Sequence, residues 1–287
     1  FEKFESFTRT LPGEVLPAHR SYMRRQLHPL VLCAPFAYRT FHKPLGYAGD
    51  YEMVNMILRN GWEGDSLFAK IVNMWFLRQP PAQAHRNRVA YLTDRLQDET
   101  LRARHCGRAA RVFNLACGPA HEVQQFLRES PASQSATVTL LDFNDETLQH
   151  VEAALAAAKA QSGRRTPLTY VHKSVHQLLK ESGRGDRRPA AEAYDFVYCA
   201  GLFDYLSDQV CRRLMELLYG WLAPGGLLVA TNVEPSNPLR NGMEHLLDWH
   251  LIYRTGAELV RLRPKEAHIE QVLVLADATG TNVFLEV

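Results

Sequence analysis

The stretch RVFNLACGPAHEVQQFL, residues 111–127, decides the fold of this chain. Its apolar residues 112–115 predict a strand, and the small residues 116–120 that follow predict a tight turn. A helix is expected to begin near His121, and strand, turn and helix in this order are typical of a doubly wound α/β fold. Only Gly118 remains where a dinucleotide-binding turn would have three glycines, which argues against a pyrophosphate as the ligand of this turn.

Strands and helices alternate through the rest of the chain. The hydrophobic pattern predicts strands over 111–116, 137–142, 168–172, 194–199 and 226–233, and helices over 121–130, 145–161, 174–182 and 207–222. The closing segments HIEQVLVLADA and NVFLEV are joined by TGTN, which predicts a hairpin. The expected fold is therefore a Rossmann-like, doubly wound, mostly parallel sheet with helices on both faces and an antiparallel C-terminal strand.

The upstream part of the chain has little strand pattern. Apolar residues recur there at helical spacing over 50–60, 65–79 and 82–97. Asp50 and Asp65 stand where helix N-caps would, and Pro80-Pro81 is expected to separate two helices. We therefore expect an N-terminal helical region over residues 1–105, which would act as a lid and recognise the substrate, and an α/β domain over residues 106–287.

The composition is that of an ordinary globular chain. Hydrophobic residues make up 46% and charged residues 22%, and the net charge of +2 indicates no general attraction to nucleic acid or membrane. Basic residues cluster over 102–111 and 184–188, in segments expected to be polar loops. The five cysteines include no C-x-x-C pair, which argues against a disulfide framework or a metal site. Without an apolar run of ~20 residues or an export signal, a cytoplasmic protein is expected.

Four motifs together resemble those of the class I S-adenosylmethionine-dependent methyltransferases, over roughly residues 108–287. They are VFNLACGPA at the first strand, VTLLDFND at the second, YDFVYCAGLFDYL at the fourth and LAPGGLLVATNV at the fifth. Each motif alone is weakly specific, but the four occur in the order and spacing of this family. The resemblance implies an enzyme that transfers the methyl group of S-adenosylmethionine by in-line displacement and releases S-adenosylhomocysteine.

The resemblance also implies which residues hold the cofactor. S-adenosylmethionine has no pyrophosphate, so the first turn needs small residues for close backbone approach rather than several glycines. Asp142 is expected to accept hydrogen bonds from the ribose hydroxyls, and Phe143 to lie against the adenine. The expected cofactor-binding set is Tyr47, Asn114, Ala116, Cys117, Gly118, Pro119, Asp142, Phe143, Ser174, Val175, Cys199, Ala200 and Gly201.

Some of these positions depart from the family pattern. Asn114 stands where an acidic residue is usual, and it brings no charge to the ammonium group of the cofactor. Ser174-Val175 stands where a carboxylate often recognises adenine, so adenine would be read by the backbone or by the Ser174 hydroxyl. We interpret Cys117 and Cys199 as small apolar residues rather than nucleophiles, because no histidine stands beside them in a catalytic pattern.

Two further stretches extend the resemblance over most of the chain, KPLGYAGDYEMVNMI (43–57) and NPLRNGMEHLLDWHLIYRTGAEL (237–259). They are similar to segments of a bacterial methyltransferase group linked to the synthesis of 3-hydroxypalmitic acid methyl ester. A helix is expected over roughly 240–261, with one face formed by His245, Trp249, Ile252 and Tyr253. The acceptor would be a small, fatty-acid-like molecule or a secondary metabolite, and its expected binding set is Tyr47, Tyr51, Asn237, His245, Trp249 and Tyr253.

The need for a catalytic base depends on the acceptor. A carboxylate is ionised at neutral pH and needs no base, whereas a hydroxyl or an amine does. The candidate catalytic residues are Tyr51, Asp204 and His245. The N-terminal helices would close over both substrates, and Tyr47 and Tyr51 would then contact the methionine end of the cofactor.

The sequence leaves several alternatives open. One is the N-methylation of a small amine or heteroaromatic metabolite, and another is a non-catalytic sensor or partner subunit that binds S-adenosylmethionine. A nicotinamide-dependent oxidoreductase is disfavoured because the turn lacks two glycines. Nucleic-acid methylation is disfavoured because there is no basic stripe and no Asn/Asp-Pro-Pro-aromatic motif after the fourth strand. Both a monomer and a homodimer are compatible with the sequence.

Overall fold

A computed structural model describes residues 2–182 and 193–287 of the chain, which forms two compact units. Unit 1 comprises Phe1–Asn87, Glu234–Leu251 and Asp277–Asn282, and unit 2 comprises Arg88–Val233, Ile252–Ala276 and Val283–Val287. The boundary expected near residue 105 thus differs from a division at residue 87, in which unit 1 also takes two later segments. The basic stretch 184–188 lies outside the described residues.

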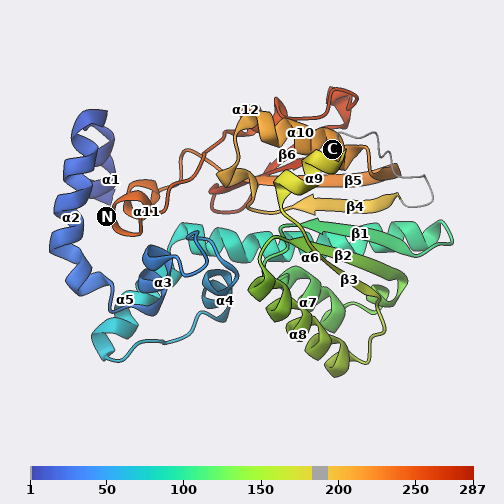
Figure 1. The fold of residues 1–287 in the computed structure, drawn as a ribbon, viewed down its shortest axis with the longest axis horizontal. Coiled ribbons are helices and arrows are strands. Elements are labelled where there is room, and N and C mark those ends of the chain that lie inside the picture. Colours follow the sequence, from blue (N-terminus) through green and yellow to red (C-terminus); the bar gives the residue numbers. More distant parts are fainter. Residues whose placement is uncertain (1, 183–192) are drawn as a thin grey trace. The chain divides into compact units, whose positions relative to one another are not determined.

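The sheet has seven strands in the order β3-β2-β1-β4-β5-β7-β6 (Figure 1). The strands are β1 (Ala110–Leu115), β2 (Ala136–Asp142), β3 (Leu168–His172), β4 (Tyr194–Cys199), β5 (Leu222–Val233), β6 (Leu273–Ala276) and β7 (Asn282–Glu286). The first five strands pair in parallel, and β6 and β7 form the predicted antiparallel hairpin. The order reverses at the β1–β4 pair, where open sheets of this kind bind ligands at the carboxyl ends of their strands. The predicted fold class is confirmed.

Helices cover both faces of the sheet (Figure 1). One face packs against α6 (Pro80–His105), α7 (His121–Glu129) and α8 (Asp145–Ser162), and the other against α9 (Val175–Ser182), α10 (Asp208–Tyr219) and α12 (Gly256–Val260). Successive side chains of β1 alternate between the faces, since Val112 joins the first cluster and Phe113 the second. This double burial explains why the predicted strands are nearly continuous apolar runs.

Unit 1 is helical, as predicted. It contains α1 (Glu2–Arg9), α2 (Leu16–Val31), α3 (Pro35–His42), α4 (Tyr51–Arg59), α5 (Leu67–Leu77), the first turns of α6, and α11 (Arg240–Leu246). Asp50 caps α4 as expected, because its carboxylate accepts a hydrogen bond from the Met53 N–H. The cap expected at Asp65 is wrong: Ser66, next to the first helical residue, accepts the Ala69 N–H instead. None of the helices among the described residues has the length and apolarity to cross a membrane.

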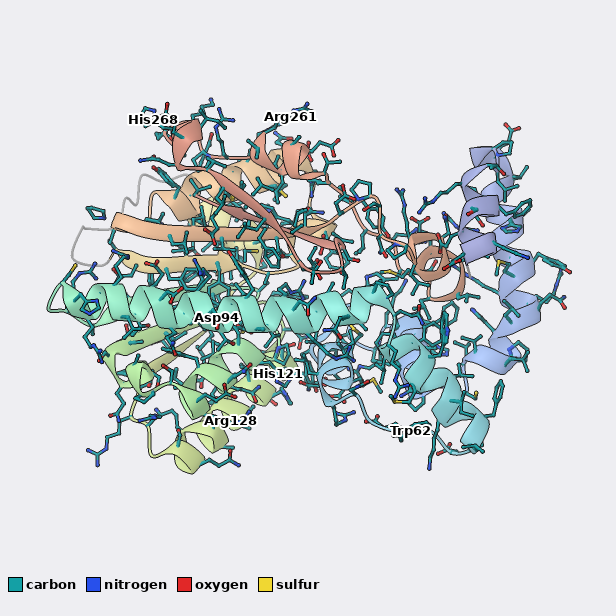
Figure 2. All side chains as sticks on the ribbon, turned by 180° about the vertical axis from the view of Figure 1, so that it is seen from behind. Trp62, Asp94, His121, Arg128, Arg261 and His268 are labelled. Carbon is teal, nitrogen blue, oxygen red and sulfur yellow. The ribbon has the colours of Figure 1, made fainter. Side chains whose placement is uncertain are left out.

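The third predicted helix is longer than expected. The pattern predicts a helix over 82–97, but α6 continues unbroken to His105 (Figure 2). Arg102 and Arg104 therefore lie on a helix and not in a polar loop. Arg102 donates to Glu99 one turn earlier (2.6 Å), and cations in a last turn also interact favourably with the helix dipole, which explains the extension.

The helix predicted over 240–261 is wrong. The chain forms α11 and α12 there, separated by residues 247–255. It leaves the helical conformation at Asp248, whose φ of 52° is left-handed and whose carboxylate accepts hydrogen bonds from Arg24 and Lys43 (both 2.7 Å). The expected helical face therefore does not exist: His245 and Trp249 belong to unit 1, whereas Ile252 and Tyr253 belong to unit 2.

Candidate functional site

The turn after β1 has an unusual backbone. Ala116, Gly118 and Ala120 all have left-handed conformations, with φ of 56°, 51° and 47°. This conformation costs an alanine roughly 1–2 kcal/mol, and such strain concentrates at functional sites. A Cβ added to Gly118 would meet no described atom within 4 Å, so the backbone of the turn faces open space. The small residues predicted here therefore leave room for a ligand to approach the backbone.

Asp142, the last residue of β2, ties this turn to the neighbouring strand. The buried carboxylate accepts hydrogen bonds from the backbone N–H groups of Gly118 (3.2 Å) and Asn144 (3.1 Å). Burial raises the pKa of this carboxyl, and the hydrogen bonds from the backbone act in the opposite direction. Each carboxylate oxygen has a second lone pair, so Asp142 can still accept hydrogen bonds from a ligand with neighbouring hydroxyls.

The residues expected near adenine lie at the next strand ends. The Phe143 side chain is 48% exposed, and the ring nitrogen Nε2 of His172 lies 2.8 Å from the Phe143 carbonyl oxygen. The Ser174 hydroxyl accepts the Gln177 N–H (3.2 Å), and the Gln177 amide oxygen accepts the Ser174 N–H (2.8 Å). Ser174 therefore caps α9, which begins at Val175, and its role toward adenine stays a prediction.

A buried carboxylate that the sequence analysis missed lies beside Asn114. Glu122, in the first turn of α7, accepts hydrogen bonds on Oε1 from the Asn114 amide (3.0 Å) and the Tyr198 hydroxyl (2.8 Å). Burial raises the pKa of Glu122, and these hydrogen bonds oppose the shift. The negative charge that is missing at Asn114 is thus present eight residues later. The sequence offered one indication of this role, because Glu122 is an acidic residue at the start of the helix that follows the turn.

The loop after β4 lies at the same carboxyl ends of the parallel strands as the turn after β1 and Asp142. Gly201 has a φ of 94°, and its N–H donates to the Thr231 hydroxyl on β5 (3.0 Å). Cys199 and Cys117 are buried, and burial raises the pKa of both thiols, which agrees with their interpretation as small apolar residues. Ala200 links Cys199 to Gly201 and is half-buried. Among the described residues, no group of three or more His, Cys, Asp or Glu could hold a metal ion.

Asp204 is the candidate catalytic residue of this loop. Its buried carboxylate accepts the Val233 N–H (2.7 Å), and its backbone oxygen accepts the Ile252 N–H (2.7 Å). Burial raises the pKa of Asp204 to about 7, while the Val233 hydrogen bond and the charges of Arg88 and Arg254 act in the opposite direction.

This pKa makes the stability of the protein depend on pH. Because the folded carboxyl has a pKa of about 7 and an unfolded one of ~3.9, the folded state holds the proton more tightly. The stabilisation is complete below pH ~4 and is lost as the pH rises to about 7, with a slope of up to ~1.4 kcal/mol per pH unit. We expect Asp204→Asn to remove this dependence, since an amide oxygen can still accept the Val233 N–H.

Urea unfolding of the wild type and Asp204→Asn between pH 4 and pH 8 measures the effect. As the pH rises to about 7, the free energy of unfolding of the variant should increase relative to that of the wild type. Above about pH 7 the difference between the two should stay constant. A constant difference over the whole range would contradict the raised pKa of Asp204.

Arg254 holds the same loop. Its side chain is 3% exposed and donates to the carbonyl oxygens of Phe203 (2.7 Å) and Leu206 (2.6 Å), to Asn232 Oδ1 (2.7 Å) and to Asp208 Oδ1 (2.9 Å). This cation therefore fixes the segment that follows Gly201 against β5 and the start of α10.

The remaining predicted residues lie in other surroundings. In unit 1, the His245 ring is buried against the rings of Phe4 (5.4 Å between centroids) and His19 (5.2 Å). Burial lowers the pKa of His245, and Nδ1 lies 2.8 Å from the Asn241 carbonyl oxygen. Tyr253, in unit 2, is half-buried. The structure gives His245 the role of packing α1 and α2 on α11, and a catalytic role stays a prediction.

Four other predicted residues share unit 1 with His245. The Asn237 side chain accepts the Leu239 N–H (3.0 Å) and so shapes the turn before α11. Trp249 is buried in the apolar cluster of this unit. Tyr47 and Tyr51 are half-buried, and the Arg39 guanidinium lies 5.9 Å from the centre of the Tyr51 ring. Their roles toward cofactor and acceptor stay predictions.

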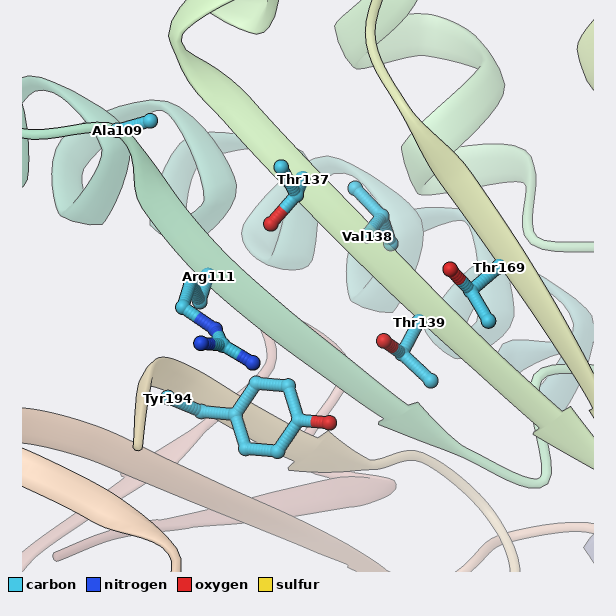
Figure 3. A pocket seen from close by; sticks show the side chains of 7 residues that line it. All are labelled: Ala109, Arg111, Thr137, Val138, Thr139, Thr169 and Tyr194. Carbon is cyan, nitrogen blue, oxygen red and sulfur yellow. The ribbon is translucent and has the colours of Figure 1, made fainter. Parts of the chain in front are cut away.

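A cavity of about 420 Å³ lies elsewhere on unit 2 (Figure 3). It is lined by Ala109, Arg111, Thr137, Val138, Thr139, Thr169 and Tyr194. These residues precede their strands or belong to the first half or the middle of them, whereas the turn after β1 follows its strand and Asp142 ends β2. The cavity is therefore separate from the candidate site.

Comparison with known proteins bears on the same residues. Residues 112–226 match the family model for a methyltransferase domain. An uncharacterised protein of Rickettsia prowazekii is 22% identical over 142 residues, which cover 49% of this chain and 50% of that protein. The chain thus spans about half the length of this curated relative.

Among solved structures, the chain is similar to a possible exported protein from Bordetella parapertussis, with a TM-score of 0.64 at 18% identity over 96% of this chain and 98% of that one. It is also similar to magnesium protoporphyrin IX methyltransferase from Synechocystis with bound S-adenosylhomocysteine, with a TM-score of 0.49 at 12% identity over 94% of this chain and 97% of that one. The first likeness supports the fold, and the second is too weak to add to it. The family match spans the turn after β1, Asp142 and the loop after β4, and these segments form the candidate site.

Proposed function

We propose that the protein transfers the methyl group of S-adenosylmethionine to a carboxylate oxygen of a small, fatty-acid-like acceptor. The observation that carries the proposal is the left-handed turn at Ala116, Gly118 and Ala120, which is open above Gly118 and bound to the Asp142 carboxylate. Such a turn has room for backbone contact with a sulfonium nucleoside, and the carboxylate can accept hydrogen bonds from its ribose.

The residues at the carboxyl edge fit this cofactor. Asp142 would hold the ribose hydroxyls, Phe143 would cover the adenine, and the backbone of residues 116–120 would lie along the methionine portion. When bound, S-adenosylmethionine supplies an electrophilic methyl group. The protein therefore has to bind, align the acceptor and keep water out.

The acceptor class rests on the two stretches that resemble the 3-hydroxypalmitic acid methyl ester group. In unit 1 these stretches contribute to one apolar cluster, to which α4 brings Met53 and Met56, and α11 brings Met243 and Leu246. Methionine side chains adapt to irregular apolar shapes, as an acyl chain requires. We propose that unit 1 recognises the acyl chain of the acceptor, whose ionised carboxylate needs no base.

A second candidate function is the methylation of a hydroxyl or an amine. The observation that favours it is the pKa of Asp204, which burial raises to about 7, the range in which a carboxylate can act as a general base at neutral pH. An N-methyltransferase of a small amine would use Asp204 in this way.

Transfer of a labelled methyl group to three matched acceptors distinguishes these functions. A 3-hydroxy fatty acid, the corresponding fatty alcohol and the corresponding amine are each incubated with the protein and S-[methyl-³H]adenosylmethionine. We expect label in the fatty acid product, and mild alkali should release it as methanol because it is an ester. Alkali-stable label on the alcohol or the amine would replace the ester proposal with the second function. Calorimetric binding of NAD instead of S-adenosylmethionine would refute both.

A further inference from the structure

Arg88, on α6, is a buried cation without a partner among the described residues. Its side chain is in unit 2 and is 8% exposed, yet the guanidinium forms no hydrogen bond or ion pair within residues 2–182 and 193–287. Arg254, buried in the same unit, is by contrast fully engaged with carbonyl and carboxylate oxygens. Burying an unpaired charge is costly, so a guanidinium in this position points to a ligand that would pair with it.

The position of the guanidinium connects it to the candidate site. A Cβ added to Gly201 would lie 3.2 Å from Nη1 and 3.5 Å from Nη2 of Arg88, so the cation packs directly on the loop after β4. In the sheet, Cys199 of β4 pairs with Leu115 of β1, and the turn after β1 begins at the next residue. Arg88 therefore lies near the carboxyl ends of β1 and β4, the two strands between which the strand order reverses.

Two buried carboxylates interact electrostatically with this cation. The charges of Asp204 and Glu122 both act on Arg88, although neither carboxylate is within hydrogen-bonding distance of it. A simple anion placed beside Arg88 would be repelled by these carboxylates in their ionised forms. A group that carries a carboxylate and an ammonium side by side would instead meet a charge of opposite sign at each end.

We propose that Arg88 binds the carboxylate of the amino-acid end of S-adenosylmethionine, and that Glu122 and Asp204 favour the adjacent ammonium. The inference rests on the proposed use of this cofactor. The planar fork of an arginine matches the two oxygens of a carboxylate, which a lysine cannot reproduce. Glu122 in this role supplies the charge that Asn114 does not.

Binding of S-adenosylmethionine and of its decarboxylated form tests the proposal without any turnover. The decarboxylated form keeps the sulfonium and the ammonium and lacks only the carboxylate. By calorimetry, the wild type should prefer the complete cofactor by roughly 10- to 100-fold, the range of a charge-assisted hydrogen-bonded pair. Arg88→Gln should reduce this preference to less than about 3-fold, because it should weaken the binding of the complete cofactor and leave the binding of the decarboxylated form unchanged. Arg104→Gln, an exposed change on the same helix, should keep the wild-type preference.

Two results would overturn the assignment. One is that Arg88→Gln retains the wild-type preference for the complete cofactor. The other is that this variant loses affinity for both ligands to the same extent. If Arg88→Gln does not fold, as judged by its thermal unfolding, Arg88→Lys keeps the charge and should show a reduced but measurable preference, and an unchanged preference in it would also count against the proposal. A wild type that binds neither form would refute the proposed function itself.

Discussion

Asp142→Asn is expected to weaken the binding of S-adenosylhomocysteine by about 10- to 100-fold. The carboxylate accepts the N–H groups of Gly118 and Asn144 on different oxygens. An asparagine has one oxygen, so its NH₂ group would face one of these donors, and one of the two hydrogen bonds would be lost. The variant would also lose the charged acceptor for the ribose hydroxyls, and charge-assisted hydrogen bonds contribute ~1.5–3 kcal/mol each. Titration calorimetry of both proteins measures the change.

Asp145→Asn is the matched control for this prediction. Asp145 lies three residues away, its side chain is 71% exposed, and it pairs only with His172, at 3.1 Å, among the described residues. We expect Asp145→Asn to bind the ligand like the wild type. An analogue of S-adenosylhomocysteine without ribose hydroxyls should lose less affinity in Asp142→Asn than S-adenosylhomocysteine does. Ligand affinity in Asp142→Asn within about 3-fold of wild type would contradict the role of Asp142.

The sheet could be predicted from sequence because each central strand is a short apolar run that ends at turn residues. The predicted bounds of β3 and β4 are those of the structure. The difference at β5 has a local cause: the strand begins at Leu222 rather than at residue 226, because Leu222 already pairs with Tyr194 before the register shifts at the following Pro-Gly-Gly turn. A β-bulge of this kind has no hydrophobic periodicity by which it could be recognised in the sequence.

The segment 247–255 could not be predicted, because its conformation is set by distant residues. Helical spacing continues through Asp248, but Lys43 and Arg24, 205 and 224 residues away in the chain, bind its carboxylate where the backbone turns left-handed. Tertiary contacts thus override the local periodicity. The same limit applies to the site. The turn and Asp142 could be predicted because they belong to recognisable motifs. Arg88 and Glu122 could not, because their charges interact only once α6 and α7 are folded together.

Arg254→Gln is expected to lower the free energy of unfolding by about 3 kcal/mol or more. The substitution removes the charged donor from the carbonyl oxygens of Phe203 and Leu206, and hydrogen bonds to charged groups contribute ~1.5–3 kcal/mol each. It also removes the buried cation beside Asp208 and Asn232. Urea unfolding at pH 7 measures the loss.

Arg212→Gln separates this network from an ordinary ion pair, because Arg212 faces the same Asp208 carboxylate. Its side chain is 53% exposed and lies 3.9 Å from Asp208, so its removal should cost less than ~0.5 kcal/mol. A loss below ~1 kcal/mol in Arg254→Gln would show that the carbonyl contacts do not hold the loop. The expected loss would instead explain the stretch DWHLIYR in physical terms: its arginine anchors the loop that carries Gly201 and Asp204, on which Arg88 packs.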